Sequence, residues 1–474
     1  MRVEGVYRGR FSRWDPTRPT ASAIAVSNGR VVALDDEAES LASDARVKED
    51  FGELPVFPGF HDAHCHTTGY GLGLGELDLS SPPICSLEDL YGAVAARSAD
   101  LAPGAWLVGS GYDQNKIGGS HPERRRLDEV ARGRPVWLRH TSGHMCVVSS
   151  ATFELIGEAA RNPIEGGAVE RDTLGEPTGL LEERAQGLVH ALVLPRSIES
   201  LVEAIGAAHE RYLSEGLTSV CDAGIAGGWI GQSPIELAAY QAARDAGLLK
   251  VRSTVMISSD VLSPVAAHAR DCTARSLDAG IRSGLGDEWL RIGPLKIFAD
   301  GSLIGRTCWM EHEFADDPGN TGYPQDEPAA LRQMIIDAHL AGWQVATHAI
   351  GDAAVSFVLE ALEEALGRKA RHDHRHRIEH CGVTTPQALD HIARLGVVPV
   401  PQGRFVGEIG DGMLAALGEA RTGHAYRLRS FLEAGIPLPG SSDRPVVDGR
   451  PLLGIKDMAV RRTESGRPFA PGEA

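Results

Sequence analysis

The sequence predicts an α/β fold, a (β/α)8 TIM-type barrel, because short apolar runs alternate with amphipathic segments along most of the chain. The first run covers residues 54–60, and the later runs are 216–224, 251–258, 290–301, 344–352, 376–381, 397–402 and 436–443. Residues 329–341 and 353–365, which separate later runs, carry apolar residues three to four positions apart, as helices do. Eight strands that alternate with helices close into a barrel.

Two segments do not fit the barrel repeat. Residues 1–56 alternate apolar and polar positions in short pieces, and Asn28-Gly29 between two runs is typical of a tight hairpin turn. We therefore expect a small N-terminal β-domain at 1–56 and a barrel at 57–474. Residues 67–205 are too many for one crossover, so we expect an insertion subdomain there, between the first and second barrel strands.

A helix start is also predicted before the run at 397–402. Thr385 is a residue type that caps helix N-termini, and Pro386 is favoured in the first turn.

Composition excludes several classes of partner. The chain has 64 acidic and 47 basic side chains, a net charge of −17, which would repel nucleic acid and anionic membranes. No apolar run approaches the ~18 residues of a membrane span, and the first ten residues lack the apolar core of a signal peptide. The seven cysteines are scattered and never in Cys-x-x-Cys spacing. A cytoplasmic protein without structural disulfides is the simplest expectation.

Histidines and acids recur where the apolar runs end. In PGFHDAHCH (58–66), His64 and His66 project from one side of an extended segment, and the later runs carry Lys296, His348, His380 and Asp443. The carboxyl ends of barrel strands meet at one mouth, so these side chains would converge. An isolated His-x-His is more often two unrelated histidines. The set of six, however, has the ligand types of a two-metal hydrolase.

PGFHDAHCH resembles the opening signature of the amidohydrolase superfamily. Four later stretches narrow the resemblance to the branch that includes N-substituted formamide deformylase; they are LKIFADGSLIGRT (295–307), THAIGD (347–352), RIEHCG (377–382) and SSDRPV (441–446). The similarity follows the family's order over nearly the whole chain.

The candidate ligands predict one or two bound divalent ions. His64, His66 and Asp443 would hold one ion, and His348 and His380 would hold the other. Zinc is the expected metal, although iron, manganese or nickel suit the same ligands. A protonated lysine cannot ligate a cation. The resemblance implies that Lys296 is carboxylated to a bridging carbamate. From the residues alone, Lys296 would instead be a buried lysine paired with Asp300 or Asp443.

The expected activity is hydrolysis of a C–N bond other than a peptide bond, in a small amide, formamide or cyclic amide. A metal-activated water would attack, and Asp443 would pass its proton to the leaving nitrogen. One alternative is a one-metal deaminase with Asp352 as proton shuttle, although Lys296 argues against it. Another is a barrel without catalysis that serves as a binding or regulatory protein.

Four further residues are candidates for substrate binding. His144 matches the family histidine that reaches the site from the insertion, although Ser142 stands where the family usually has Asp. Tyr112 and Arg306 could hold the substrate carbonyl or an acidic group, and Asp222 could orient a ligand. Packing or ion-pair roles are the alternatives. Two other groups are expected outside the site: Glu182 and Glu183 on a helix surface, and His372, His374 and His376 in a solvated turn.

The end of the chain departs from the family pattern. Family members usually continue beyond the segment that follows Asp443 with strands that complete the small β-domain. We therefore expect this domain to be incomplete. An unpaired sheet edge favours association, so a homo-oligomer is one expectation.

Overall fold

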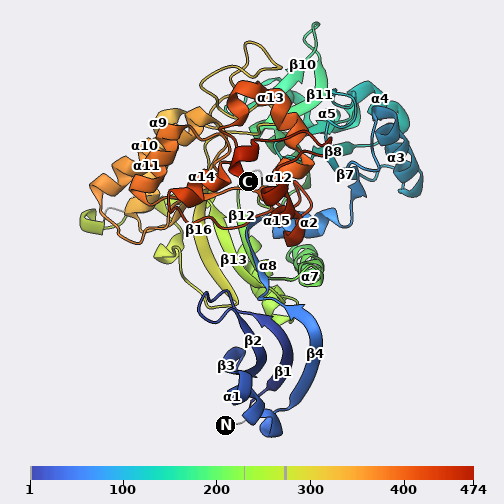
Figure 1. The fold of residues 1–474 in the computed structure, drawn as a ribbon. Coiled ribbons are helices and arrows are strands. Elements are labelled where there is room, and N and C mark those ends of the chain that lie inside the picture. Colours follow the sequence, from blue (N-terminus) through green and yellow to red (C-terminus); the bar gives the residue numbers. More distant parts are fainter. Residues whose placement is uncertain (1–2, 229, 272–274) are drawn as a thin grey trace. The chain divides into compact units, whose positions relative to one another are not determined.

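The computed structural model describes residues 3–228, 230–271 and 275–474. The chain divides into two compact units, Met1–Phe60 and His61–Ala474 (Figure 1). The boundary lies four residues after the predicted one, which followed residue 56.

The smaller unit holds a four-stranded sheet with the order β3-β2-β1-β4. Its strands are β1 (Gly5–Ser12), β2 (Thr20–Ser27), β3 (Arg30–Leu34) and β4 (Val47–Val56), and α1 (Asp35–Ser40) follows β3. The pairs β1–β2 and β2–β3 are antiparallel, whereas β1–β4 is parallel. Asn28 and Gly29 have φ values of 52° and 67° between β2 and β3, so the predicted hairpin turn is confirmed. That the unit is incomplete stays a prediction.

The larger unit contains a parallel sheet of seven strands that forms a nearly closed barrel. The order is β19-β18-β17-β16-β13-β12-β5. The strands are β5 (Phe60–Cys65), β12 (Leu217–Ile225), β13 (Arg252–Ser258), β16 (Leu290–Phe298), β17 (Val345–Ala349), β18 (Arg377–His380) and β19 (Val398–Val400). Each of these strands lies within one of the predicted apolar runs or continues it. Seven of the predicted strands are therefore confirmed.

The predicted eighth strand, at residues 436–443, is reduced to one parallel bridge between Ser441 and Gln402. Pro437 and Pro439 have no N–H group to donate to a strand ladder, which explains why the segment does not form a regular strand. The segment still reaches β5, because the Ala63 N–H donates to the Gly440 carbonyl at 3.0 Å.

Helices surround the barrel and bury one face each against the strands. They include α7 (Ile198–Ser214), α8 (Glu236–Asp245), α9 (Pro328–Leu340), α10 (Asp352–Arg368), α11 (Pro386–Leu395) and α14 (Leu428–Glu433). Leu295, Ile335 and Val358 belong to the apolar core that strands and helices share. The helices predicted at 329–341 and 353–365 are confirmed as α9 and α10.

Between β5 and β12 the chain builds a second sheet with the order β10-β11-β9-β8-β7-β6. Its strands are β6 (Leu77–Asp78), β7 (Leu107–Tyr112), β8 (Val136–His140), β9 (Met145–Val148), β10 (Gly167–Arg171) and β11 (Pro177–Glu183). The helices of this stretch are α2 (Thr67–Gly73), α3 (Leu87–Asp100), α4 (Arg124–Val130), α5 (Ser150–Ile156) and α6 (Gly187–Val193). Leu90, Leu127 and Leu138 belong to an apolar cluster of this sheet and its helices. That residues 67–205 are a subdomain stays a prediction.

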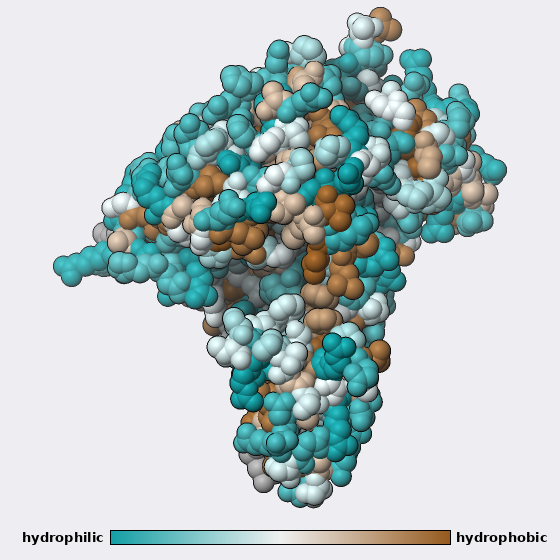
Figure 2. Space-filling view, viewed as in Figure 1, coloured by the Kyte–Doolittle hydropathy of each residue, from teal (hydrophilic) through white to brown (hydrophobic). Residues whose placement is uncertain are grey.

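Three helices near the C-terminus complete the larger unit: α12 (Gly403–Glu408), α13 (Gly410–Thr422) and α15 (Pro451–Val460). Most of the visible surface is hydrophilic, and hydrophobic residues gather around α15 (Figure 2), where Leu452, Ile455 and Val460 are exposed. Within the described residues, every helix is too short or too polar to cross a membrane.

We predict that Thr385→Ala lowers the free energy of unfolding by about 1 kcal/mol. The Thr385 hydroxyl accepts a hydrogen bond from the Ala388 N–H at 3.2 Å, as the sequence predicted for the start of α11. The alanine would leave this N–H group without its cap. The midpoint of urea unfolding measures the loss, and Thr385→Ser, which keeps the hydroxyl, serves as the control. Equal midpoints for the alanine and serine variants would contradict the prediction.

Candidate metal centre

Three of the six candidate ligands form a tight cluster at the mouth of the barrel. One ligand atom from each of His64, His66 and Asp443 lies within 4.8 Å of the others. The Nε2 atoms of His64 and His66 lie 3.2 and 3.1 Å from Asp443 Oδ1. β5 supplies His64, and His66 comes directly after that strand on the same side of the extended chain.

The chemistry of this contact fits a divalent cation. His64 Nδ1 is hydrogen-bonded to the Glu379 carboxylate, so Nδ1 carries the proton and Nε2 presents a lone pair. That Nε2 and Asp443 Oδ1 are both buried, and neither has a hydrogen-bond partner among the described residues. Two buried lone pairs that face each other at 3.2 Å repel, and a cation that binds both would remove the repulsion.

Glu379 is a functional candidate that the sequence analysis missed. Its buried carboxylate contacts His64 Nδ1 and also accepts hydrogen bonds from the Arg377 guanidinium at 2.7 and 2.8 Å. Burial raises the pKa of Glu379, but the charge of Arg377 and the hydrogen bonds from His64 and Arg377 outweigh this effect and hold the pKa well below its usual range. A signal was available, because Glu379 directly precedes His380 in the RIEHCG motif.

His380 extends the cluster toward the next strand. Its ring centroid lies 4.9 Å from that of His64, and its Nδ1 lies 4.0 Å from Asp443 Oδ2 and 2.8 Å from Gln402 Oε1. The φ angles of His380 and Asp443 are 67° and 61°, positive values that are uncommon for residues other than glycine. Backbone strain of this kind concentrates at functional sites. Burial is the main cause that lowers the pKa of His380 to about 3.

His348 is the next ring in the row. Its centroid lies 4.4 Å from that of His380, and its Nε2 lies 3.0 Å from the Gly301 carbonyl oxygen and 3.4 Å from Asp300 Oδ1. The bond to Gly301 places the proton on Nε2, so Nδ1 is the atom that could bind a metal. Burial lowers the pKa of His348 well below its ordinary value, and His380 adds to this effect.

Lys296 is buried in β16, and its Nζ has no hydrogen-bond partner among the described residues. Nζ lies 4.6 Å from the centre of the Phe298 ring, and burial lowers the pKa of Lys296 to about 8. The expected pairing with Asp300 is not found. The Asp300 carboxylate instead accepts hydrogen bonds from the backbone N–H groups of Trp309, Ile350 and Gly351.

His144 reaches the same place from the second sheet. Its ring centroid lies 4.9 Å from that of His348, and its Nδ1 lies 2.8 Å from Glu183 Oε2. Glu183 is fully buried at the end of β11, where Thr307 Oγ1 and Gln325 Nε2 also donate to its carboxylate at 2.6 and 2.7 Å. The prediction that Glu182 and Glu183 lie on a helix surface is therefore wrong. Both belong to a strand.

The other three substrate-binding candidates each have a side-chain partner of their own. Tyr112 is buried in the apolar cluster of the second sheet, and its hydroxyl lies 3.0 Å from His121 Nδ1. Arg306 forms an ion pair with Asp316. Asp222 is buried at the carboxyl end of β12, where the Tyr240 hydroxyl donates to it. Burial raises the pKa of Asp222, and the charge of nearby His66 counteracts this.

The histidines that precede β18 were predicted to form a solvated turn, which is wrong for two of them. His374 and His376 are buried, with exposed fractions of 6% and 0%. His376 Nε2 lies 2.8 Å from His339 Nδ1, and His374 Nε2 lies 2.9 Å from the Leu395 carbonyl oxygen. These contacts tie β18 to α9 and to the end of α11, so the histidines have a structural role.

The space directly beside the histidine row is small. A cavity of about 20 Å³ is lined by His144, His348, His380 and Asp443 and by apolar residues of α12, of α13 and of the junction between them; these are Phe405, Met413 and Ile409. A cavity of this size has room for about one water molecule and not for an organic substrate.

Comparisons with known proteins agree with this picture. A sequence model described as the amidohydrolase family matches residues 50–473. The putative amidohydrolase YtcJ of Bacillus subtilis (strain 168) is 29% identical over 447 residues, which cover 91% of this chain and 80% of that protein. N-substituted formamide deformylase of Arthrobacter pascens is 29% identical over 472 residues, which cover 97% of this chain and 84% of that protein.

A solved structure extends the similarity to the fold. The crystal structure of an uncharacterized metal-dependent hydrolase from Pyrococcus furiosus superposes with a TM-score of 0.71 at 26% identity, covering 99% of this chain and 90% of that one. The family match covers most of the chain and confirms the resemblance inferred from its motifs. The chain belongs to the amidohydrolase family.

Proposed function

We propose that this protein is a metal-dependent hydrolase that cleaves a C–N bond, other than a peptide bond, in a small amide, formamide or cyclic amide. The observation that carries the proposal is the buried contact between His64 Nε2 and Asp443 Oδ1, where two lone pairs need a cation between them. The deformylase among its relatives supports the bond type, and the structural neighbour supports the metal dependence.

The ligands divide into two groups. His64, His66 and Asp443 would hold one divalent ion, with zinc as the proposed metal, and His348 and His380 would hold a second. Lys296 would bridge them as a carbamate, because its buried Nζ has no hydrogen-bond partner among the described residues. In that modification the neutral Nζ amine forms a bond to the carbon of carbon dioxide, one C–O π bond opens to give the carboxylate, and Nζ releases one proton. A bound metal lowers the pKa of a water molecule to about 7 and polarises a substrate carbonyl.

The side chains around the ligands have separate tasks. Asp443 is proposed to accept the proton of the attacking water on its carboxylate and to deliver it to the leaving nitrogen. Glu379 keeps the His64 ring in place through a hydrogen bond with His64 Nδ1, and Gln402 does the same for His380 through His380 Nδ1. His144, held by Glu183, is proposed to orient the substrate carbonyl.

The one-metal deaminase is the less favoured alternative. Its expected proton shuttle, Asp352, lies at the start of α10, where its Oδ1 accepts hydrogen bonds from the Glu311 and Ala353 N–H groups at 2.9 and 3.1 Å. A carboxylate held by backbone donors in this way is less suited to moving protons.

We predict that Asp443→Asn lowers kcat on an amide substrate by about 10²–10⁴-fold, because asparagine keeps the shape of the side chain but cannot take up the proton. Steady-state kinetics on a panel of formamides, acetamides and cyclic amides measures the loss. Asp245→Asn, an exposed change at the end of α8, is the matched control and should keep wild-type rates. Wild-type activity of the Asp443→Asn variant would refute the role of Asp443.

We predict that Lys296→Ala loses metal and activity and that added formate restores part of both. Formate supplies two carboxylate oxygens in the space that the shortened side chain leaves, as the carbamate would. Metal per chain is measured by plasma mass spectrometry, with activity alongside. The control is Lys250→Ala, a change at an exposed lysine. Full metal content in Lys296→Ala without formate would show that Lys296 is not a bridge.

We predict that Glu183→Gln lowers kcat/KM by about tenfold and that His144→Asn in the same background adds little further loss. Residues that act as one unit give non-additive effects in a double-mutant cycle. Glutamine keeps the volume and an acceptor for Thr307 or His144, so the fold should persist, as circular dichroism would verify. Fully additive losses would show that Glu183 does not act through His144.

A further inference from the structure

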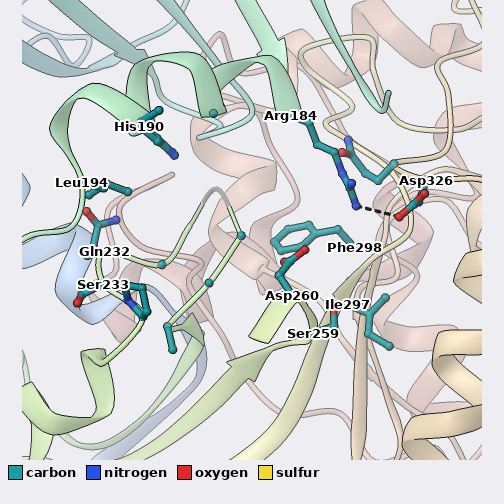
Figure 3. A pocket seen from close by; sticks show the side chains of 18 of the residues that line it. Arg184, His190, Leu194, Gln232, Ser233, Ser259, Asp260, Ile297, Phe298 and Asp326 are labelled. Carbon is teal, nitrogen blue, oxygen red and sulfur yellow. Dashed lines mark hydrogen bonds and ion pairs between the residues drawn. The ribbon is translucent and has the colours of Figure 1, made fainter. Parts of the chain in front are cut away.

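A second and much larger cavity lies at the carboxyl ends of β12, β13 and β16. Its volume is about 510 Å³, within the usual range for small-molecule sites. Its walls come from the loops that follow these strands and from α6 of the second sheet's region, and Figure 3 shows His190 and Leu194 on one side and Arg184 with Asp326 on another.

One aromatic ring separates this cavity from the candidate metal centre. Phe298 lines the cavity, and the same ring lies 4.6 Å from Lys296 Nζ and 5.2 Å, centre to centre, from the His348 ring. A substrate whose reacting carbonyl lies at the histidine row has almost no room beside it, because the adjoining cavity measures about 20 Å³. The larger cavity can hold the rest of such a molecule.

The charges of the cavity lining favour a cation. The Asp260 carboxylate and the Phe298 ring both line the cavity (Figure 3), and within the described chain no basic side chain forms an ion pair with Asp260. Arg184 is paired with Asp326 at 3.1 Å, so its charge is offset. Burial lowers the pKa of His190 to about 4, so this ring is neutral near pH 7.

The neighbours of Asp260 narrow the kind of cation. Its Oδ2 accepts a hydrogen bond from the Ser258 hydroxyl at 2.7 Å, which occupies one side of the carboxylate. A guanidinium prefers two free carboxylate oxygens, whereas an ammonium group needs one. The Phe298 ring, which lines the same cavity, also attracts an ammonium group through its quadrupole. Leu194, Leu331 and Met334 provide apolar walls for an alkyl chain.

We propose that this cavity binds a protonated alkylamine, carried by the substrate at the end remote from the bond that is cleaved. Asp260 and Phe298 receive the ammonium group, and the apolar walls receive the alkyl chain. The position of the reacting bond rests on the proposed function, whereas binding of the alkylamine can be measured without turnover.

The first arm of the test measures binding alone. Calorimetry with hexylammonium and with hexan-1-ol, its neutral counterpart, is carried out on the wild type, on Asp260→Asn and on the control Asp245→Asn. We expect hexylammonium to bind the wild type and the control, to bind Asp260→Asn about tenfold more weakly, and to lose affinity with added salt. Hexan-1-ol should bind all three proteins equally. Equal affinity of hexylammonium for wild type and Asp260→Asn would overturn the proposal.

The second arm separates this inference from the proposed function. The monoacetyl amide of 1,6-diaminohexane is compared with N-hexylacetamide, which lacks the ammonium group. We expect kcat/KM of the wild type to favour the charged amide by about tenfold, and Asp260→Asn to lose this preference, whereas the control Asp245→Asn keeps it. Charge-dependent binding without hydrolysis of any amide would sustain the cavity and overturn the proposed function. Hydrolysis of both amides at equal rates would support the proposed function and overturn the proposal for the cavity.

Discussion

The return of residues 440–444 to β5 is the contact on which the rest of the site depends. The Asp443 N–H donates to the His64 carbonyl and the His66 N–H donates to the Arg444 carbonyl, each at 2.7 Å. These bonds join the first and last barrel segments and set their register. A slip of one residue would turn the Asp443 side chain to the opposite face and away from both histidines. The Arg444 guanidinium adds a buried ion pair with Glu215 at 2.6 Å.

Each histidine of the row is held by a partner on another segment. Glu379 holds His64, Gln402 holds His380 and Glu183 holds His144 through Nδ1, whereas the Gly301 carbonyl holds His348 through Nε2. Because Nδ1 of His64 and of His380 is engaged in this way, Nε2 is the atom of each of these two rings that could bind a metal. Buried polar groups are costly unless they are paired, so this network also stabilises one arrangement of the rings over others.

The two cavities divide the mouth of the barrel. On one side, Phe405 and Met413 pack near the histidine row and leave space for about one water molecule. On the other side, the region beyond Phe298 stays open and carries the Asp260 carboxylate. Phe298 therefore belongs both to the surroundings of Lys296 and to the wall of the larger cavity.

The sequence by itself determined the features that follow from local pattern. Apolar periodicity predicted the seven barrel strands that the structure has, the Asn28-Gly29 pair predicted the hairpin, and Thr385 predicted the helix start. The motifs also identified His64, His66 and Asp443, because residue type and position at a strand end are readable without coordinates. These features depend on neighbours that are close in the chain.

Which side chains meet depends on how distant parts of the chain pack together. Glu183 bonds to His144 from 39 positions away and Glu379 to His64 from 315, and no local periodicity encodes such pairs. Burial also depends on three-dimensional packing, which is why His376 proved to be a buried partner of His339 and Tyr112 a core residue. The eighth barrel segment was decided in the same way. Its two prolines have no N–H group to donate, so the segment does not form a regular strand. The closure of the barrel still brings Asp443 to the histidines.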